Sequence, residues 1–147
     1  MSRIKKNITN GSNNLRSSKT LYRERLNLRT ISSFANIHND RPRHEIITQI
    51  RGLFLAEYTI VFVSGRPDTY KKETIEWLEN NIGLAEYYLL MRQGHDSRDD
   101  TDVKRDIYKN YLIGKKIIKV FDDRPRVIRM WREEGLEVVD VGSGIEF

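Results

Sequence analysis

From residue 39 onward, two kinds of apolar pattern alternate along the chain, and this alternation limits the fold more than any other feature. Continuous β-branched and aromatic runs at 59–63, 87–91, 117–121 and 136–141 are typical of strands buried on both faces. Between them, apolar residues recur at helical spacing, first at Ile46, Ile47, Ile50, Leu53 and Phe54. Because parallel strands need crossover connections, the chain is predicted to be an α/β protein with a mainly parallel sheet.

Four helices are expected between and after these strands. Asp40 would cap the first, with Pro42 in its first turn. Residues 67–68 would open the second. The third helix would carry apolar residues at helical spacing at Val103, Ile107 and Tyr111. The fourth would carry Val127, Ile128 and Trp131 in the same way and end at Gly135.

Polar residues follow two of the predicted strands where each strand ends. Ser64, Gly65 and Arg66 could donate hydrogen bonds and positive charge to a phosphate, or form an ordinary turn with a capping serine. Asp122 and Asp123 suit Mg²⁺, which binds through one or two carboxylates, water and a substrate phosphate. Asp123 could instead cap the helix that opens at residues 124–125. In an open parallel sheet, ligands bind at this edge.

A charged segment lies between these two motifs. Lys104 falls beside the core face of the third helix, near its N-terminus, where its ammonium could lean towards the strand ends. On its own, one helical lysine is more often exposed. Arg92 and Arg98 could grip a polyanion or pair with nearby carboxylates, namely Asp96, Asp99 and Asp100.

Together, these motifs resemble a known family. Ser-Gly-Arg at 64–66, Met-Arg-Gln-Gly-His-Asp-Ser-Arg-Asp-Asp-Thr-Asp-Val-Lys at 91–104 and Phe-Asp-Asp-Arg at 121–124 are similar to the phosphatase domain of bacteriophage-type polynucleotide kinase-phosphatase, with Met130-Trp131-Arg132 in support. That domain belongs to the haloacid dehalogenase (HAD) superfamily. The resemblance covers residues 34–147 and implies a HAD-like Rossmannoid fold of three layers.

The resemblance implies a Mg²⁺-dependent phosphomonoester hydrolase that removes 3′-phosphates from nucleic-acid ends through an aspartyl-phosphate. Ser64 would hydrogen-bond the transferring phosphoryl group, and Lys104 would neutralise charge beside it. Arg66 and Arg92 would hold the substrate. Asp122 and Asp123 would hold Mg²⁺ directly or through water.

The family's first motif, Asp-x-Asp-Gly-Thr, is missing. Its first aspartate attacks phosphorus and its second moves a proton. Asn10-Gly11-Ser12 is the nearest remnant, and it would place Ile8 where the nucleophile should be. The motif should end a central strand between those that end at Ser64 and Asp122. Residues 6–9 are too short and polar for that strand and Arg29 interrupts 28–31, so we expect the strand to be absent or degenerate.

Charge divides the chain in a similar place. The net charge is +5, yet residues 1–31 hold eight basic and one acidic side chain, which leaves −2 for the rest. Residues 1–33 are therefore expected to be a basic, disordered or unrelated arm, and 34–147 the HAD-like domain. The chain has no run of about 18 apolar residues, no secretion signal and no cysteine, which favours the cytoplasm and excludes membrane partners.

Three hypotheses remain. The chain is an active phosphatase that takes a carboxylate from elsewhere, a non-catalytic module that binds nucleic-acid ends or a partner, or a truncated or frame-shifted fragment of an active enzyme. No P-loop of the form Gly-x4-Gly-Lys-Ser/Thr occurs, so any kinase partner would be encoded separately.

Overall fold

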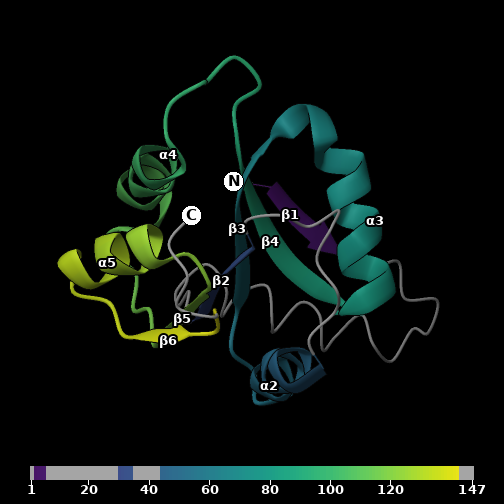
Figure 1. Cartoon of the computed structure of the whole chain (residues 1–147). Coiled ribbons are helices and arrows are strands. Elements are labelled where there is room, and N and C mark those ends of the chain that lie inside the picture. Colours follow the sequence, from purple (N-terminus) through teal and green to yellow (C-terminus); the bar gives the residue numbers. More distant parts are fainter. Residues whose placement is uncertain (1, 6–29, 35–43, 143–147) are drawn as a thin grey trace.

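The computed structural model describes residues 2–5, 30–34 and 44–142, and these form a six-stranded sheet between two layers of helices (Figure 1). The strand order is β1-β4-β3-β2-β5-β6. The strands are β1 (Ser2–Lys5), β2 (Thr30–Phe34), β3 (Ile60–Pro67), β4 (Glu86–Arg92), β5 (Lys119–Asp122) and β6 (Val138–Asp140). All neighbours pair in parallel except β1, which runs antiparallel to β4. The predicted α/β class with a mainly parallel sheet is confirmed.

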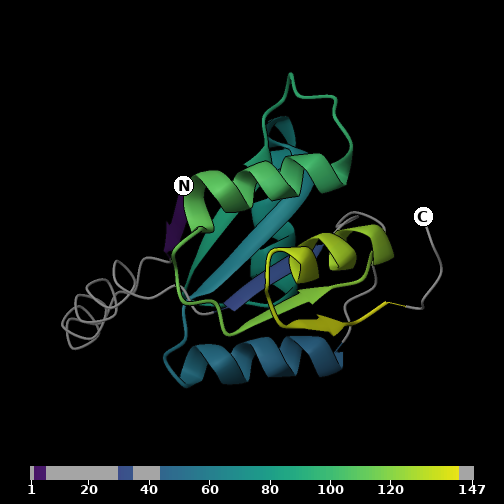
Figure 2. The same cartoon turned by 90° about the vertical axis from the view of Figure 1, so that its left-hand side faces the viewer.

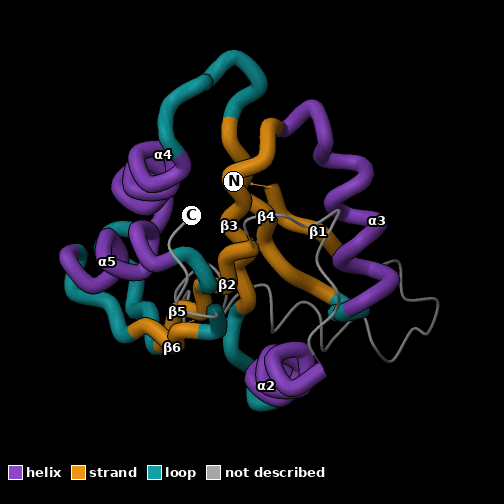
Figure 3. The backbone as a smooth tube through the Cα atoms, in the orientation of Figure 1, coloured by secondary structure: helices purple, strands orange, loops and turns teal. Residues whose placement is uncertain are grey.

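Helices cover both faces of this sheet (Figure 3). They are α2 (His44–Leu55), the short η1 (Asp68–Tyr70), α3 (Lys71–Asn81), α4 (Asp100–Ile107) with its π-helical extension η2 (Tyr108–Leu112), and α5 (Pro125–Glu133). Figure 2 shows α4 and α2 on opposite sides of the strands. The predicted capping role of Asp40 and the position of Pro42 lie outside the described residues.

The core has two halves, one on each face of the sheet, because side chains of a strand alternate between faces. Val61 and Val63 of β3 pack with residues of α4 and α5, including Trp131. Ile60 and Phe62 of the same strand pack with α2 and α3. A central parallel strand therefore has to be apolar at every position, as the run at 59–63 predicted.

Strand β2 corrects part of one expectation about this sheet, since the strand is present but lacks the aspartates of the family's first motif. We expected the central position between β3 and β5 to be empty or degenerate, and Thr30–Phe34 fills it, in parallel register with both neighbours. Pairing on both sides supplies a hydrogen-bonding partner strand along each edge, which outweighs the weak strand propensity of this sequence. The strand nevertheless carries no carboxylate, since its sequence is Thr-Ile-Ser-Ser-Phe.

Strand β1 extends the sheet at the other edge. Arg3 forms an ion pair with Glu86, a buried residue at the start of β4. Residues 6–29, which make up most of the expected basic arm, lie outside the described residues. None of the helices in the described part of the chain has the length and hydropathy to cross a bilayer.

Replacing Ile50 by alanine should lower the free energy of unfolding by about 2–5 kcal/mol, because the side chain is fully buried under β3. Leu55→Ala is the matched control in the same helix, since Leu55 is 80% exposed. Its effect should stay within about 0.5 kcal/mol. Urea denaturation measures both, and equal losses would contradict the packing of α2 on the sheet.

Candidate functional site

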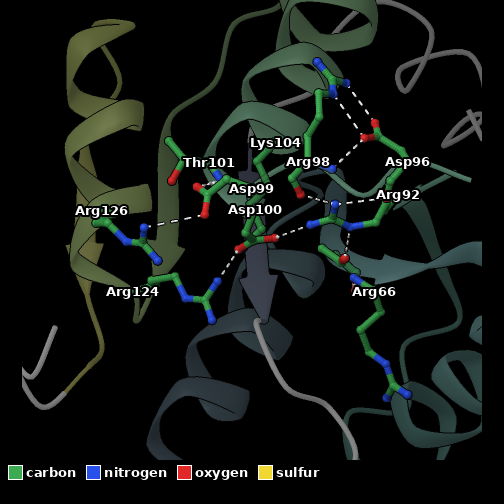
Figure 4. A network of polar contacts seen from close by, with 12 residues as sticks. Arg66, Arg92, Asp96, Arg98, Asp99, Asp100, Thr101, Lys104, Arg124 and Arg126 are labelled. Carbon is green, nitrogen blue, oxygen red and sulfur yellow. Dashed lines mark hydrogen bonds and ion pairs between the residues drawn. The ribbon is translucent and has the colours of Figure 1, made fainter. Parts of the chain in front are cut away.

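Charged side chains converge at the carboxyl ends of β3, β4 and β5, beside the N-terminus of α4 (Figure 4). Lys104 of α4 is fully buried. Its ammonium nitrogen lies 3.4 Å from Asp100 Oδ2 and 3.5 Å from Asp122 Oδ2. These are ion pairs, and the nitrogen has no hydrogen-bond partner among the described residues. The expectation that Lys104 leans towards the strand ends is confirmed.

Asp122, at the end of β5, is also fully buried and is fixed by neutral donors. Its Oδ1 accepts a hydrogen bond from the backbone N–H of Arg124 at 3.1 Å. Its Oδ2 accepts one from the indole N–H of Trp131 at 3.0 Å. The indole is itself held in the core, with its ring edge-to-face with Tyr108. The carboxylate therefore has a set orientation towards Lys104.

Asp100 is the member of the site that sequence reasoning missed, since it was weighed only as a partner for nearby arginines. It lies at the start of α4, and Asp99 caps that helix by accepting a hydrogen bond from Thr101 N–H. Three cations surround the Asp100 carboxylate: Arg124 at 3.1 Å, Lys104 at 3.4 Å and Arg92 at 3.8 Å. The four-residue spacing between Asp100 and Lys104 on one helix was the available signal.

Gly65 allows Asp100 to come this close to β3. A Cβ added at Gly65 would lie 1.6 Å from Asp100 Oδ1, so any side chain at this position would displace the carboxylate. The neighbouring Ser64 is buried, and its Oγ accepts a hydrogen bond from Arg66 N–H at 3.1 Å. Ser64, Gly65 and Arg66 thus lie within β3, beside a register irregularity between Ser64 and Pro67, and not in a turn after the strand. The interpretation of Ser64 as a helix cap is wrong, because Pro67 is the N-cap of η1 and no side chain caps it.

The Arg92 side chain, at the end of β4, forms hydrogen bonds with β3 and with the loop that follows β4. Its Nε donates to the Gly65 carbonyl oxygen at 2.6 Å, and its Nη1 donates to the carbonyl oxygens of Asp96 and Arg98. The remaining Nη2 faces Asp100. Arg98 pairs with Asp96, as the simpler interpretation of this segment expected. Hydrogen bonds from Arg98 hold the pKa of Asp96 well below its usual range.

Two expected site residues stand apart from this cluster. Figure 4 shows the Arg66 side chain directed away from Asp100 and Arg92, and its guanidinium carbon lies 4.8 Å from the centre of the Tyr70 ring. Asp123 follows Asp122 on the loop to α5, and its backbone carbonyl oxygen abuts Gly142. The helix-capping role considered for Asp123 is wrong, because Arg124 is the N-cap of α5 and Pro125 its first residue.

The environment of Asp122 suits Mg²⁺ poorly. Mg²⁺ needs oxygen ligands at about 2.0–2.1 Å and usually keeps several waters. Asp122 has no exposed surface, both its oxygens accept N–H hydrogen bonds, and an ammonium faces it. Over the described ranges, no three histidine or carboxylate side chains gather as metal ligands.

The close approach at Gly65 generates a test of the cluster. Gly65→Ala should push Asp100 away from its three cations and lower the free energy of unfolding by about 1–3 kcal/mol, as overpacking does. Gly52→Ala is the control, because a Cβ there meets nothing within 4 Å and alanine favours the helix by up to about 1 kcal/mol. Urea denaturation of both variants measures the difference. A Gly65 variant as stable as the wild type would mean that Asp100 does not sit against β3.

Comparison with known proteins identifies the family. The family model described as the polynucleotide kinase PNKP phosphatase domain matches residues 20–146. Over 108 residues the chain is 36% identical to a putative bifunctional polynucleotide kinase/RNA ligase of Autographa californica nuclear polyhedrosis virus. The aligned stretch covers 71% of this chain and only 16% of that protein.

Solved structures share the fold. Chains in two structures of the Pnkp1/Rnl/Hen1 complex, one of them described as an RNA repair complex, superpose with TM-scores of 0.70 and 0.71 at 24% and 23% identity. Each match covers 82% of this chain and less than half of the other, 44% and 47%. The match of the family model over most of the sequence shows that the chain belongs to the phosphatase-domain family of polynucleotide kinase-phosphatases, with its HAD-like fold.

Proposed function

We propose that this domain binds phosphate-bearing ends of polynucleotides, RNA ends first, without hydrolysing them. The observation that carries the proposal is the Lys104 ammonium, which is fully buried at the ligand-binding edge of the sheet without a hydrogen-bond partner among the described residues. A buried donor of this kind costs free energy unless a ligand or water satisfies it. A phosphate oxygen is a suitable acceptor.

The surroundings of Lys104 support an anionic ligand. Arg92 and Arg124 approach the same carboxylate, so three cations share the space beside Asp100. Arginine forks match the geometry of phosphate oxygens. Ser64, next to Gly65 at this edge, would donate its hydroxyl hydrogen to the same phosphate. Arg66 would act farther out, along the nucleotide chain, because its side chain points away from the cluster.

The absence of turnover rests on β2. Family members use an aspartate on the central strand as nucleophile, and this strand has the sequence Thr-Ile-Ser-Ser-Phe. In the register of the sheet, Phe34 lies opposite Ser64. The first carboxylate after it in the sequence is Asp40. Without a carboxylate at the strand end, phosphoryl transfer to an aspartate has no acceptor.

The proposed preference for RNA follows from the viral relative, whose name pairs a polynucleotide kinase with an RNA ligase. The polynucleotide ligand also suits the basic segment 1–33, which we propose adds salt-sensitive attraction to the nucleic-acid backbone. The domain would begin before residue 34, the boundary expected from the sequence, because β2 (Thr30–Phe34) is a central strand of the sheet and the family model already matches from residue 20.

We expect the chain to bind an RNA oligonucleotide with a 3′-phosphate more tightly than the same oligonucleotide with a 3′-hydroxyl. Arg124→Gln should reduce this preference about tenfold or more, because a hydrogen bond to a charged group contributes about 1.5–3 kcal/mol. Arg126→Gln, on an exposed side chain of the same helix, is the control and should keep the preference. Fluorescence anisotropy measures all three proteins, and equal affinity of the wild type for both oligonucleotides would contradict the proposal.

Turnover is tested on the same oligonucleotide by measuring released inorganic phosphate in the presence of Mg²⁺. The wild type should release none. Release that disappears in Asp122→Ala would show that the chain is an active phosphatase.

A further inference from the structure

The cation that neutralises the carboxylates at this strand edge belongs to the protein itself. Lys104 lies between Asp100 and Asp122, at 3.4 and 3.5 Å, and none of its surface is exposed. A divalent metal in a phosphate site normally occupies a position of this kind, between carboxylates and substrate. Here the ammonium of a helical lysine lies between two carboxylates.

The coordination that Asp122 and Asp100 could offer a metal is correspondingly poor. Both oxygens of Asp122 already accept N–H hydrogen bonds, from Arg124 and Trp131. Asp100 is enclosed by Arg124, Arg92 and Lys104. A metal would have to displace these donors and bring its waters into a region where Asp122 is fully buried. That displacement would leave arginine and lysine charges next to a divalent cation.

The summed charge of the cluster also favours an anion over a metal cation. Arg92, Lys104 and Arg124 carry three positive charges against the two negative charges of Asp100 and Asp122, which gives a net charge of +1 for these five side chains. A divalent cation would raise this to +3, whereas a phosphomonoester dianion would lower it to −1. In a low-dielectric site, the second change is favoured and the first is opposed.

We propose that the site takes its phosphate without a divalent metal, with the Lys104 ammonium supplying the charge that Mg²⁺ would otherwise provide. This inference rests on the proposed binding of phosphate-bearing ends. It departs from the expectation, drawn from the family, that Asp122 and Asp123 hold Mg²⁺.

The test compares binding of 3′-phosphorylated and 3′-hydroxyl RNA oligonucleotides in excess EDTA and in millimolar Mg²⁺, with KCl adjusted to equal ionic strength. The quantity of interest is the ratio of the two affinities, because Mg²⁺ also screens the RNA backbone and changes both affinities together. We expect the same ratio, in favour of the 3′-phosphate, in both solutions. A preference that vanishes in EDTA and returns with Mg²⁺ would overturn metal-free binding. A ratio of one in both solutions would overturn the proposed function instead.

Removing the Lys104 charge should make the site depend on a metal ion. Lys104→Met keeps most of the side-chain volume and removes the charge, which leaves Asp100 and Asp122 without their shared ammonium. The variant should lose the 3′-phosphate preference and gain a rise in Tm with added Mg²⁺ that the wild type lacks. Lys109→Met, on an exposed lysine of η2, is the control and should match the wild type in both readouts. A wild type whose Tm rises with Mg²⁺ as steeply as that of Lys104→Met would overturn the inference. If Lys104→Met does not fold, the affinity ratio of the wild type in EDTA and Mg²⁺ decides the question.

Discussion

The contact of the buried Lys104 ammonium with Asp100 and Asp122 is the interaction on which the arrangement of this domain depends. Moving an ammonium from water to a protein interior costs several kcal/mol, and two carboxylates offset that cost only if they are themselves held in place. Each is held by a different element. Asp122 ends β5, and Asp100 begins α4. The ion pairs thus tie the helix to the strand end that it crosses.

Several residues hold the two carboxylates of that contact in place. Trp131 of α5 and the backbone of Arg124 orient Asp122, so the placement of α5 is linked to the charge cluster. Gly65 clears the space that Asp100 occupies against β3. Arg92 holds the loop before α4 by donating to backbone carbonyl oxygens.

The parts of the fold that sequence reasoning predicted are those fixed by periodicity. The run at 59–63 overlaps the first residues of β3, the run at 87–91 falls within β4, and the burial of Val103, Ile107 and Trp131 follows from helical spacing. Strand β2 was not predicted because its two serines and short length give no local signal. Its place in the sheet depends on pairing with β3 and β5, which lie far away in sequence.

The same distinction applies to the site. Lys104, Asp122 and Arg92 were expected from motifs, and the structure brings them together. Asp100 was overlooked because one of several neighbouring aspartates cannot be singled out without knowing which of them faces inward. The direction of Arg66 could not be predicted either, since it depends on the Tyr70 ring rather than on the Ser-Gly-Arg motif.

The most direct test of a phosphate site without turnover is ³¹P NMR of a short 3′-phosphorylated RNA mixed with the full chain. The account predicts that the terminal-phosphate resonance shifts on addition of protein, in EDTA as well as in Mg²⁺, while the internal phosphodiester resonances move less and no inorganic phosphate accumulates. A terminal resonance that stays unshifted, or a growing inorganic phosphate signal in Mg²⁺, would contradict it.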